Sequence, residues 1–325
     1  MDTDVAVASG ATGAGGDSGP RAAAHAASGR AVRRRQQLAT LLFIAPAIVF
    51  VAIFFAVPVV NNIIMSFQEF TTATFYTGEA PWVGLQNYID VVLDPLFARL
   101  TWNTGIFTFA SLTVTFFIGL GLALFFDKTF RLSGLLRSLL LLPWLLPLVI
   151  SAAVWRRMMD EGSGIINQIL RAIGLNGVPW LTSPDVALAS VVIVNIWIGI
   201  PFVMVILYGG LQEIPREFYE AAALDGATGW RAFWFITWPL LRPVVVVVLT
   251  LGFIYTIRAL DIVLALTGGG PANATQTYAT EAYQLSFIGF DFGHGAALSN
   301  ILIIVSLVVA GLQLRVGRRP NDLAG

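Results

Sequence analysis

Six long windows of this chain contain no Asp, Glu, Lys or Arg, and they limit the fold more than any other feature of the sequence. These windows are residues 36–68, 100–126, 138–155, 186–212, 243–257 and 292–314. A helix needs about 20 apolar residues to cross the hydrocarbon core of a bilayer. Uninterrupted runs such as Val244–Val248 and Leu139–Leu142 argue against a transmembrane β-barrel, whose strands alternate apolar and polar residues. We therefore expect an all-α, polytopic membrane helix bundle.

The windows predict six transmembrane helices. We place them near residues 38–60, 104–126, 138–157, 187–209, 243–266 and 296–314. The uncharged window 262–280 contains Thr267-Gly-Gly-Gly-Pro271, which breaks helices, so we assign it to the end of the fifth span and a loop. The mean hydropathy of +0.78 and the charged fraction of 12% agree with a membrane protein, because soluble domains carry about a quarter charged residues.

The Lys and Arg residues predict the orientation of the bundle. With the N-terminus inside, fourteen of the nineteen lie on the cytoplasmic side and four on the outer side. We therefore expect an N-in/C-in topology. Residues 1–35, rich in Ala, Gly and Ser, are expected to form a disordered cytoplasmic arm, residues 36–315 the transmembrane domain, and residues 316–325 a cytoplasmic tail. The apolar spacing within 164–174 predicts a short surface helix in the outer loop 158–186.

Composition excludes several kinds of chemistry. Nineteen basic residues balance nineteen acidic ones, so charge gives no reason to expect a nucleic-acid partner. There is no cysteine, and the two histidines, His25 and His294, are too few for a His-rich metal site. No phosphate-binding loop is present, because the single lysine, Lys128, follows Asp127 rather than a glycine-rich loop. We expect no catalytic residue, metal or cofactor in this chain.

The segment 210–242, on the expected cytoplasmic side, carries the most specific signal. Pro215 suits the first turn of a helix, and Glu217–Leu224 would form that helix. Gly226 permits a sharp bend. A second short helix, Trp230–Trp238, is expected to end before the following proline. The sequence thus predicts two short helices that form a cytoplasmic knob.

This knob has the chemistry of a docking surface. The small residues Ala221–Ala223 let a partner approach closely, and Glu220 and Asp225 offer charge to a basic partner. An amphipathic loop that rests on the bilayer surface would explain the same residues.

The spacing within this segment resembles the EAA loop of ABC importer permeases. The pattern is Glu220-Ala221-Ala222, three residues, Gly226, nine residues, then Ile236-x-x-Pro239. Leucine is usual before the proline, and this chain has Trp238 there, which alters the packing of the second helix. The resemblance implies that the loop couples transport to a partner ATPase through Glu220, Ala221, Ala222, Asp225, Gly226, Ile236 and Pro239.

Two further motifs resemble the carbohydrate branch of that family, of the maltose, trehalose and glycerol-3-phosphate type. They are Val83-Gly84-Leu85-x-Asn87-Tyr88 and Leu266-Thr267-x-Gly269-Gly270-Pro271. The first span, with Pro46 and Pro58, resembles the larger permease subunit of maltose importers. The resemblance covers about residues 38–315.

The resemblance implies a permease subunit of an ATP-driven sugar importer in the bacterial cytoplasmic (inner) membrane. Its partners would be a second homologous permease, two ATP-binding subunits that bind ATP and Mg²⁺, and an extracytoplasmic solute-binding protein. The cargo would be a di- or oligosaccharide such as trehalose or maltose. A permease of the same superfamily for a glycerophosphodiester, polyamine or peptide is the alternative. A membrane-embedded enzyme would need clustered acidic or His residues at membrane depth, and the spans supply one carboxylate there, Asp261.

Polar residues within the spans are the candidates for the substrate path, because ionisable groups at bilayer depth are costly. Arg258 and Asp261 stand three residues apart, so on a continuous helix they would share a face and could pair. They either line the path or form a structural ion pair. Asn195, Trp197 and Tyr255 could bind sugar hydroxyls and ring faces, or they pack between helices. The helix breakers Pro143, Pro147, Gly199 and Pro201 indicate kinks beside a cavity.

Overall fold

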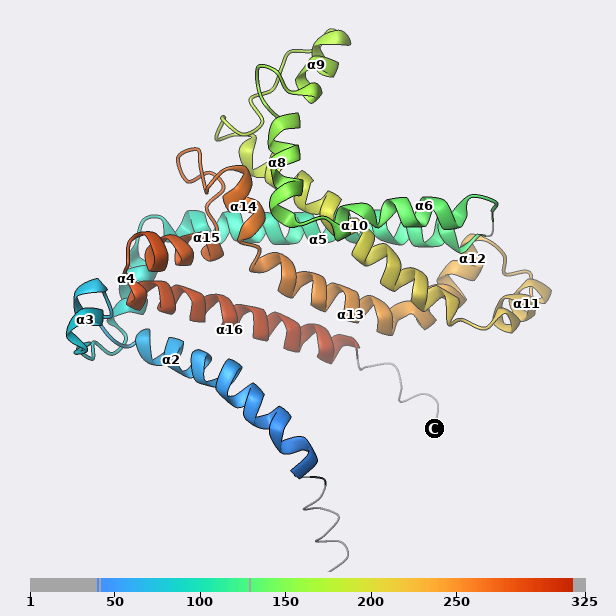
Figure 1. Ribbon diagram of the computed structural model, residues 1–325. Helices are drawn as coiled ribbons and strands as arrows, with labels where there is room; N and C mark the ends of the chain where they lie inside the picture. Colours follow the sequence, from blue (N-terminus) through green and yellow to red (C-terminus); the bar gives the residue numbers. More distant parts are fainter. Residues whose placement is uncertain (1–39, 41, 129, 318–325) are drawn as a thin grey trace, which may run out of the picture. The chain divides into compact units, whose positions relative to one another are not determined.

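The computed structural model describes residues 40, 42–128 and 130–317, and most of these residues are helical (Figure 1). The elements are η1 (Ala52–Ala56), α2 (Val57–Met65), α3 (Thr72–Thr77), α4 (Gln86–Leu93), α5 (Phe97–Asp127), α6 (Ser133–Leu140), α7 (Leu142–Leu145), α8 (Leu148–Met158), α9 (Ile165–Ala172), α10 (Ala187–Gln212), α11 (Arg216–Leu224), α12 (Trp230–Ala232), η2 (Phe233–Thr237), α13 (Trp238–Ile257), α14 (Asp261–Leu266), α15 (Tyr278–Tyr283), η3 (Gln284–Ile288) and α16 (Phe292–Gly317). The elements labelled η are single π-helical turns. The all-α prediction is confirmed.

Five continuous helices are long and apolar enough to cross a membrane. They are Leu42–Met65, Phe97–Asp127, Ala187–Gln212, Trp230–Ile257 and Phe292–Arg315. A sixth candidate is the pair Ser133–Leu145 and Leu148–Met158, which bends by 96° at its break. The predicted number of six spans is reached when this pair counts as one.

The bend in the third span lies at a proline that the sequence marks as a helix breaker. Leu146 and Pro147 both have extended backbone, with ψ of 141° and 133°. The residue before a proline is pushed out of the helical region by the proline ring, which explains the extended Leu146. The chain therefore leaves α7 and restarts in α8 at a steep angle.

The chain divides into two units, and the boundary falls within the first helix, after Asn61. In the first unit, the π-turn η1 ends where the Val57 N–H donates to the Ala52 carbonyl, directly before Pro58. A proline cannot donate and clashes with the carbonyl four residues earlier, and a wider turn relieves both problems. The predicted arm, residues 1–35, lies outside the described residues, as do residues 318–325 of the predicted tail.

In the second unit, α5, α10, α13 and α16 lie side by side (Figure 1). The contact between α5 and α10 is the most extensive, and it is close because Gly119 leaves room for Val203. A Cβ atom at Gly119 would lie 2.6 Å from Val203 Cγ1. Small residues commonly allow such close packing between membrane helices. A buried cluster that includes Phe116, Leu207 and Leu241 joins α5 and α10 to α13.

The fifth span differs from its prediction at both ends. The expected stop before Pro239 is wrong, because α12, η2 and α13 form one helix over Trp230–Ile257. The π-turn η2 accommodates Pro239 as η1 accommodates the first-span proline, with the Trp238 N–H donating to the Phe233 carbonyl. The expected helix over 243–266 is also wrong, because the backbone of Arg258 leaves the helical region with φ −104° and ψ 15°. The chain resumes as the separate helix α14.

The predicted surface helix in the outer loop is confirmed as α9. It is followed by Gly174 in the left-handed conformation, with φ +84°. Asn167 on this helix is buried and accepts hydrogen bonds from the Val178 N–H at 2.9 Å and the Trp180 indole at 3.0 Å. These bonds hold the loop against the helix.

Candidate functional site

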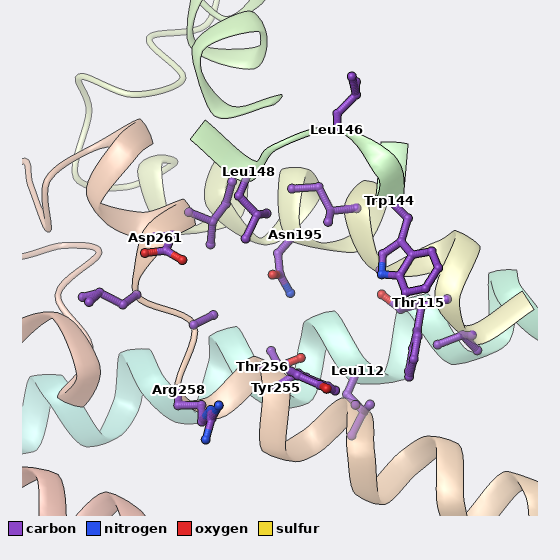
Figure 2. Close-up of a pocket in the computed structure, with 18 residues that line it drawn as sticks. Leu112, Thr115, Trp144, Leu146, Leu148, Asn195, Tyr255, Thr256, Arg258 and Asp261 are labelled. Atoms are coloured by element: carbon purple, nitrogen blue, oxygen red, sulfur yellow. The ribbon is translucent and has the colours of Figure 1, made fainter. Parts of the chain in front are cut away.

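A cavity of about 610 Å³ lies between α5, α7, α10, α13 and α14 (Figure 2). Its volume is usual for a small-molecule site, since such pockets span roughly 300–1,000 Å³. Its polar lining residues are Thr115, Asn195, Thr256, Arg258 and Asp261, and its aromatic ones are Trp144, Phe202 and Tyr255. Four of the five predicted path residues therefore share this cavity: Asn195, Tyr255, Arg258 and Asp261.

Asn195 and Tyr255 present free polar groups to this cavity. The Asn195 amide points into the open space in Figure 2 and makes no hydrogen bond with another described residue. Tyr255 is 61% exposed, and its ring stands edge-on to Phe202 at a centroid distance of 6.1 Å. An unpartnered amide beside aromatic rings can bind a polar ligand that also has an apolar face.

Arg258 and Asp261 line the cavity but do not form the expected pair. Because α13 ends at Ile257 and α14 begins at Asp261, the two residues lie on different elements rather than on one helical face. Figure 2 shows their side chains apart, and no ion pair joins them in the described part of the chain. Both side chains are exposed, so each charge is available to water or a ligand.

Trp197 is the predicted path residue that the structure places elsewhere. Its ring stands edge-on to Trp155 at 5.5 Å, and it is not among the residues that line the cavity. This contact joins α10 to α8, which is the packing role that the sequence left open.

Several cavity residues were not predicted. Trp144 and Leu146 are among the lining residues because the third span breaks beside them, and the neighbouring prolines were the signal for that break. Thr115 and Thr256 carry no such signal, because threonine is common within membrane helices and either residue could face a neighbouring helix instead.

The segment that resembles the EAA loop folds as a short helix closed by a glycine turn. After α11, the Ala227 N–H donates to the Ala222 carbonyl at 2.8 Å, and the Gly226 N–H donates to the Ala223 carbonyl at 3.1 Å. Gly226 has φ +76°. This is the Schellman motif, in which a left-handed residue ends a helix, and it explains the glycine at this position.

The exposed face of this segment is narrower than the sequence suggested. Glu220, Ala221 and Asp225 are exposed, whereas Ala222 is buried and faces the chain's own interior. The expectation that all three alanines are open to a partner is therefore wrong for Ala222. Ile236 packs against the core cluster, and Pro239 is exposed.

A hydrogen bond fixes α11 to the helix that follows. The Tyr219 and Thr237 hydroxyls lie 2.9 Å apart, and this bond ties α11 to η2. The bond therefore links the short helix α11 to the helix Trp230–Ile257, whose later residues line the cavity.

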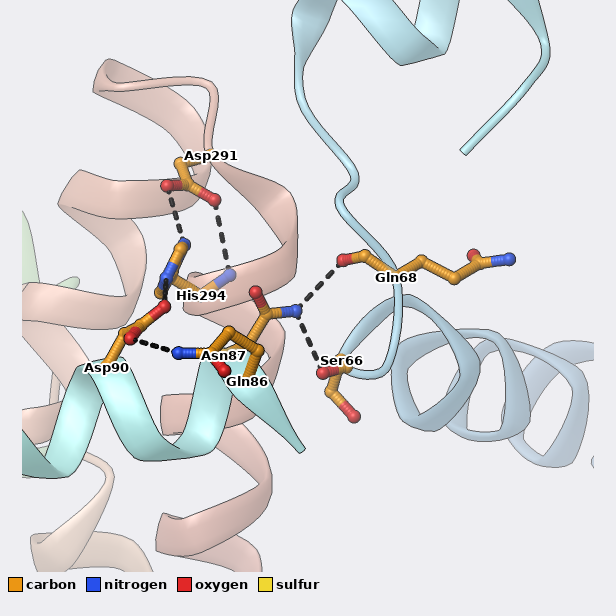
Figure 3. Close-up of polar contacts among 7 residues, drawn as sticks. All are labelled: Ser66, Gln68, Gln86, Asn87, Asp90, Asp291 and His294. Carbon is orange, nitrogen blue, oxygen red and sulfur yellow. Dashed lines mark hydrogen bonds and ion pairs between the residues drawn. The ribbon is translucent and has the colours of Figure 1, made fainter. Parts of the chain in front are cut away.

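The Val-Gly-Leu-x-Asn-Tyr motif has a structural role (Figure 3). The buried Asn87 amide donates to the Ser66 and Gln68 carbonyls, both at 2.9 Å. Tyr88 bonds to the Ser66 hydroxyl at 2.8 Å and accepts from Asn300 at 3.1 Å. The motif thus supplies hydrogen-bond donors to carbonyl groups at the end of the first membrane helix. It also connects that end to α4 and α16.

A second polar cluster lies beside it and was not predicted. His294 Nδ1 lies 2.8 Å from Asp291, and His294 Nε2 lies 3.5 Å from Asp90 on α4 (Figure 3). Burial acts to raise the pKa of Asp291, but the hydrogen bonds from His294 hold that pKa below its ordinary value. The cluster joins the start of α16 to α4.

Apolar spans of sufficient length, breaks in two of these spans and a cavity with free polar groups are typical of a helical membrane transport protein. Comparison with known families identifies which family of transport proteins this chain belongs to. Residues 115–321 match the family described as binding-protein-dependent transport system inner membrane component. The chain belongs to this family of multi-pass inner membrane permeases of ABC importers.

Similar proteins agree with this assignment. The chain is 37% identical over 281 residues to a trehalose/maltose transport system permease protein of Thermococcus litoralis, covering 86% of this chain and 94% of that protein. It is 34% identical to a sulfoquinovosyl glycerol transport system permease protein of Agrobacterium fabrum, covering 88% and 92%. The fold matches a chain of a bacterial ABC transporter involved in alginate import, with a TM-score of 0.77, 23% identity, and coverage of 90% and 99%. This chain is therefore a permease subunit of an ABC sugar importer.

Proposed function

We propose that this permease forms, with a second homologous permease, the translocation path for a di- or oligosaccharide such as trehalose or maltose. The observation that carries the proposal is the cavity that brings Asn195, Tyr255 and Asp261 to one space. Amide and carboxylate groups bind sugar hydroxyls, and aromatic faces pack against the C–H surface of a sugar ring. The trehalose/maltose permease among the similar proteins supports this choice of cargo.

The partners follow from the same proposal. An extracytoplasmic solute-binding protein delivers the sugar, and two ATP-binding subunits, which hold ATP and Mg²⁺, drive the cycle from the cytoplasm. One solved structure with this fold is described as a complex with an alginate pentasaccharide-bound periplasmic protein, which supports the first partner. The exposed Glu220 and the Gly226 turn support docking of an ATP-binding subunit at α11. With the expected N-in/C-in topology, this helix would face the cytoplasm.

The test is reconstitution of the complete importer with its solute-binding protein and a panel of sugars, polyamines and peptides. We expect a di- or oligosaccharide to stimulate ATP hydrolysis and uptake, and the purified chain alone to hydrolyse no ATP. Stimulation only by a polyamine or peptide would contradict the proposed sugar cargo. ATP hydrolysis by this chain alone would contradict the assignment of ATP hydrolysis to separate subunits.

Substitutions in the cavity test the role of its residues. Asn195→Ala should raise the sugar concentration needed for uptake, because it removes the free amide. Trp197→Phe is the matched control on the same helix, since its ring packs against Trp155 outside the cavity. Equal effects of the two substitutions would contradict the role of the cavity.

A further inference from the structure

Four aromatic rings form a continuous cluster at the start of the helix Trp230–Ile257. We call it the aromatic ladder and define it as Trp230, Phe233, Trp234 and Trp238. The Trp230 and Trp234 rings lie 5.6 Å apart, and the Trp234 and Trp238 rings 6.0 Å apart. Phe233 stacks on Trp230 at 5.3 Å. The ladder is thus one connected aromatic surface rather than a set of separate side chains.

One side of the ladder is supported by the core, and the other is open. Phe233 and Trp238 pack against the buried cluster of α5, α10 and α13. Trp230 is 72% exposed, Trp234 is 46% exposed, and the adjacent Phe235 is 76% exposed. The described residues leave a large aromatic surface uncovered, and such a surface marks a contact with another phase or partner.

The length of the helix places the ladder at the edge of the bilayer. The helix Trp230–Ile257 has 28 residues and rises about 42 Å at 1.5 Å per residue, which exceeds the hydrocarbon core of about 30 Å. The ladder occupies the first turns of this helix, which extend beyond the core toward the headgroup region. Tryptophan is enriched at this depth, because the indole ring is apolar and its N–H group is polar.

Two arginines beside the ladder fit the same depth. Arg242 lies one turn into α13, about 6 Å from Trp238, and its long side chain can extend back to the headgroups. Arg231 lies between the rings of the ladder in sequence. Both are exposed, and neither has an ion-pair partner among the described residues. Their guanidinium groups match the phosphates of anionic lipids.

We propose that the aromatic ladder, with Phe235, Arg231 and Arg242, binds the headgroup region of the bilayer and anchors the coupling segment to the membrane surface. The anchor reaches α11 through the bond between Tyr219 and Thr237, which lies in the same helical segment as the ladder. It sets the height and angle at which α11 meets its partner. This role depends on the chain's place in a membrane and not on the identity of the cargo.

Depth measurement by spin labelling tests the proposal directly. The chain has no cysteine, so single-cysteine variants can be labelled without removing native residues. A nitroxide is attached after Phe235→Cys, and after Leu224→Cys as the control, since Leu224 is 90% exposed at the end of α11. The assembled importer is placed in nanodiscs of phosphatidylethanolamine and phosphatidylglycerol. Relaxation by oxygen and by a water-soluble nickel complex then reports lipid and water exposure.

We expect the label at position 235 to be relaxed more by oxygen than by nickel, and the label at 224 to show the reverse. Equal nickel access at both positions would overturn the proposal by placing the ladder in water. Low access to both reagents at 235 would also overturn it, by placing the ladder in a protein interface with an ATP-binding or permease subunit.

A lipid titration gives an independent measurement. We expect the ATPase activity of the wild-type importer to rise with the phosphatidylglycerol fraction, and Arg231→Gln combined with Arg242→Gln to abolish that rise. Arg156→Gln is the control, because Arg156 is an exposed arginine at the end of α8, away from the ladder. An unchanged lipid dependence in the double variant would overturn the role of the two arginines.

Discussion

Gly119→Ala tests the close contact between α5 and α10 that supports one wall of the cavity. The added Cβ atom would lie 2.6 Å from Val203 Cγ1, 2.9 Å from Val203 Cβ and 3.2 Å from the Met204 nitrogen. Val203 and Met204 are buried, so neither can move freely. Overpacking of this kind costs about 1–3 kcal/mol. Removing a glycine from a helix interior stabilises by up to about 1 kcal/mol, which partly hides that cost.

Gly121→Ala removes this ambiguity, because it lies two residues further along α5 and a Cβ atom there would have no neighbour within 4 Å. The helix-propensity gain is common to both variants, so their difference reports the packing cost alone. We expect Gly119→Ala to be less stable than Gly121→Ala by about 1–3 kcal/mol. The assay is reversible denaturation of the purified chain in mixed detergent micelles, followed by circular dichroism.

A second substitution separates the packing argument from a general loss of stability. Val203→Ala removes both Cγ atoms of the residue that meets the new Cβ atom, so Gly119→Ala should cost less in that background than in the wild type. Equal stability of Gly119→Ala and Gly121→Ala would refute the close contact between α5 and α10. Additive effects of Gly119→Ala and Val203→Ala would refute Val203 as its cause.

Three further predictions concern the coupling segment, the outer polar cluster and the cavity. Gly226→Leu should lower the stability of the chain by about 1–2 kcal/mol, because the φ of +76° at this position suits glycine. Gly226→Leu and Glu220→Lys, made singly, should each lower the amount of sugar transported per ATP hydrolysed in the assembled importer. An unchanged ratio in both variants would exclude a coupling role for α11. Asp291 has a pKa below its ordinary value, so its contribution to stability is present above about pH 4 and is lost as pH falls through the lowered pKa. Asp291→Asn should therefore flatten the fall in thermal stability as pH drops below about 4. An unaltered pH profile would count against the bond to His294. Asp261→Asn should weaken sugar-stimulated ATP hydrolysis by about 10–100-fold without loss of thermal stability, because one charge-assisted hydrogen bond is lost and no ion partner is orphaned; a loss of stability would indicate a structural role instead.

The sequence predicted the features that depend on composition and residue spacing. Its predictions failed where local backbone geometry determines whether a helix continues or ends. Charge-free windows gave the spans, because lipid requires long apolar helices. The break beside Pro147 was also predictable, since proline restricts its neighbours. The stop expected before Pro239 was wrong for the opposite reason, because a π-turn lets a proline stand within a continuous helix. The end of α13 was missed because Arg258 is neither proline nor glycine.

Both breaks that interrupt membrane helices open onto the same cavity. Leu146 and Leu148 flank the first break, and Arg258, Ala259 and Leu260 form the second, and all five line the cavity. Non-helical backbone at membrane depth leaves N–H and C=O groups without helical partners, and it is tolerated only where protein or water satisfies them. At both breaks the backbone lies beside a cavity large enough to admit water, which could bond to the groups that lack a protein partner. The cavity thus accommodates the two breaks, and the residues at the breaks form part of its wall. The same cavity explains why Asn195 and Asp261 can keep unpaired polar groups within the membrane domain.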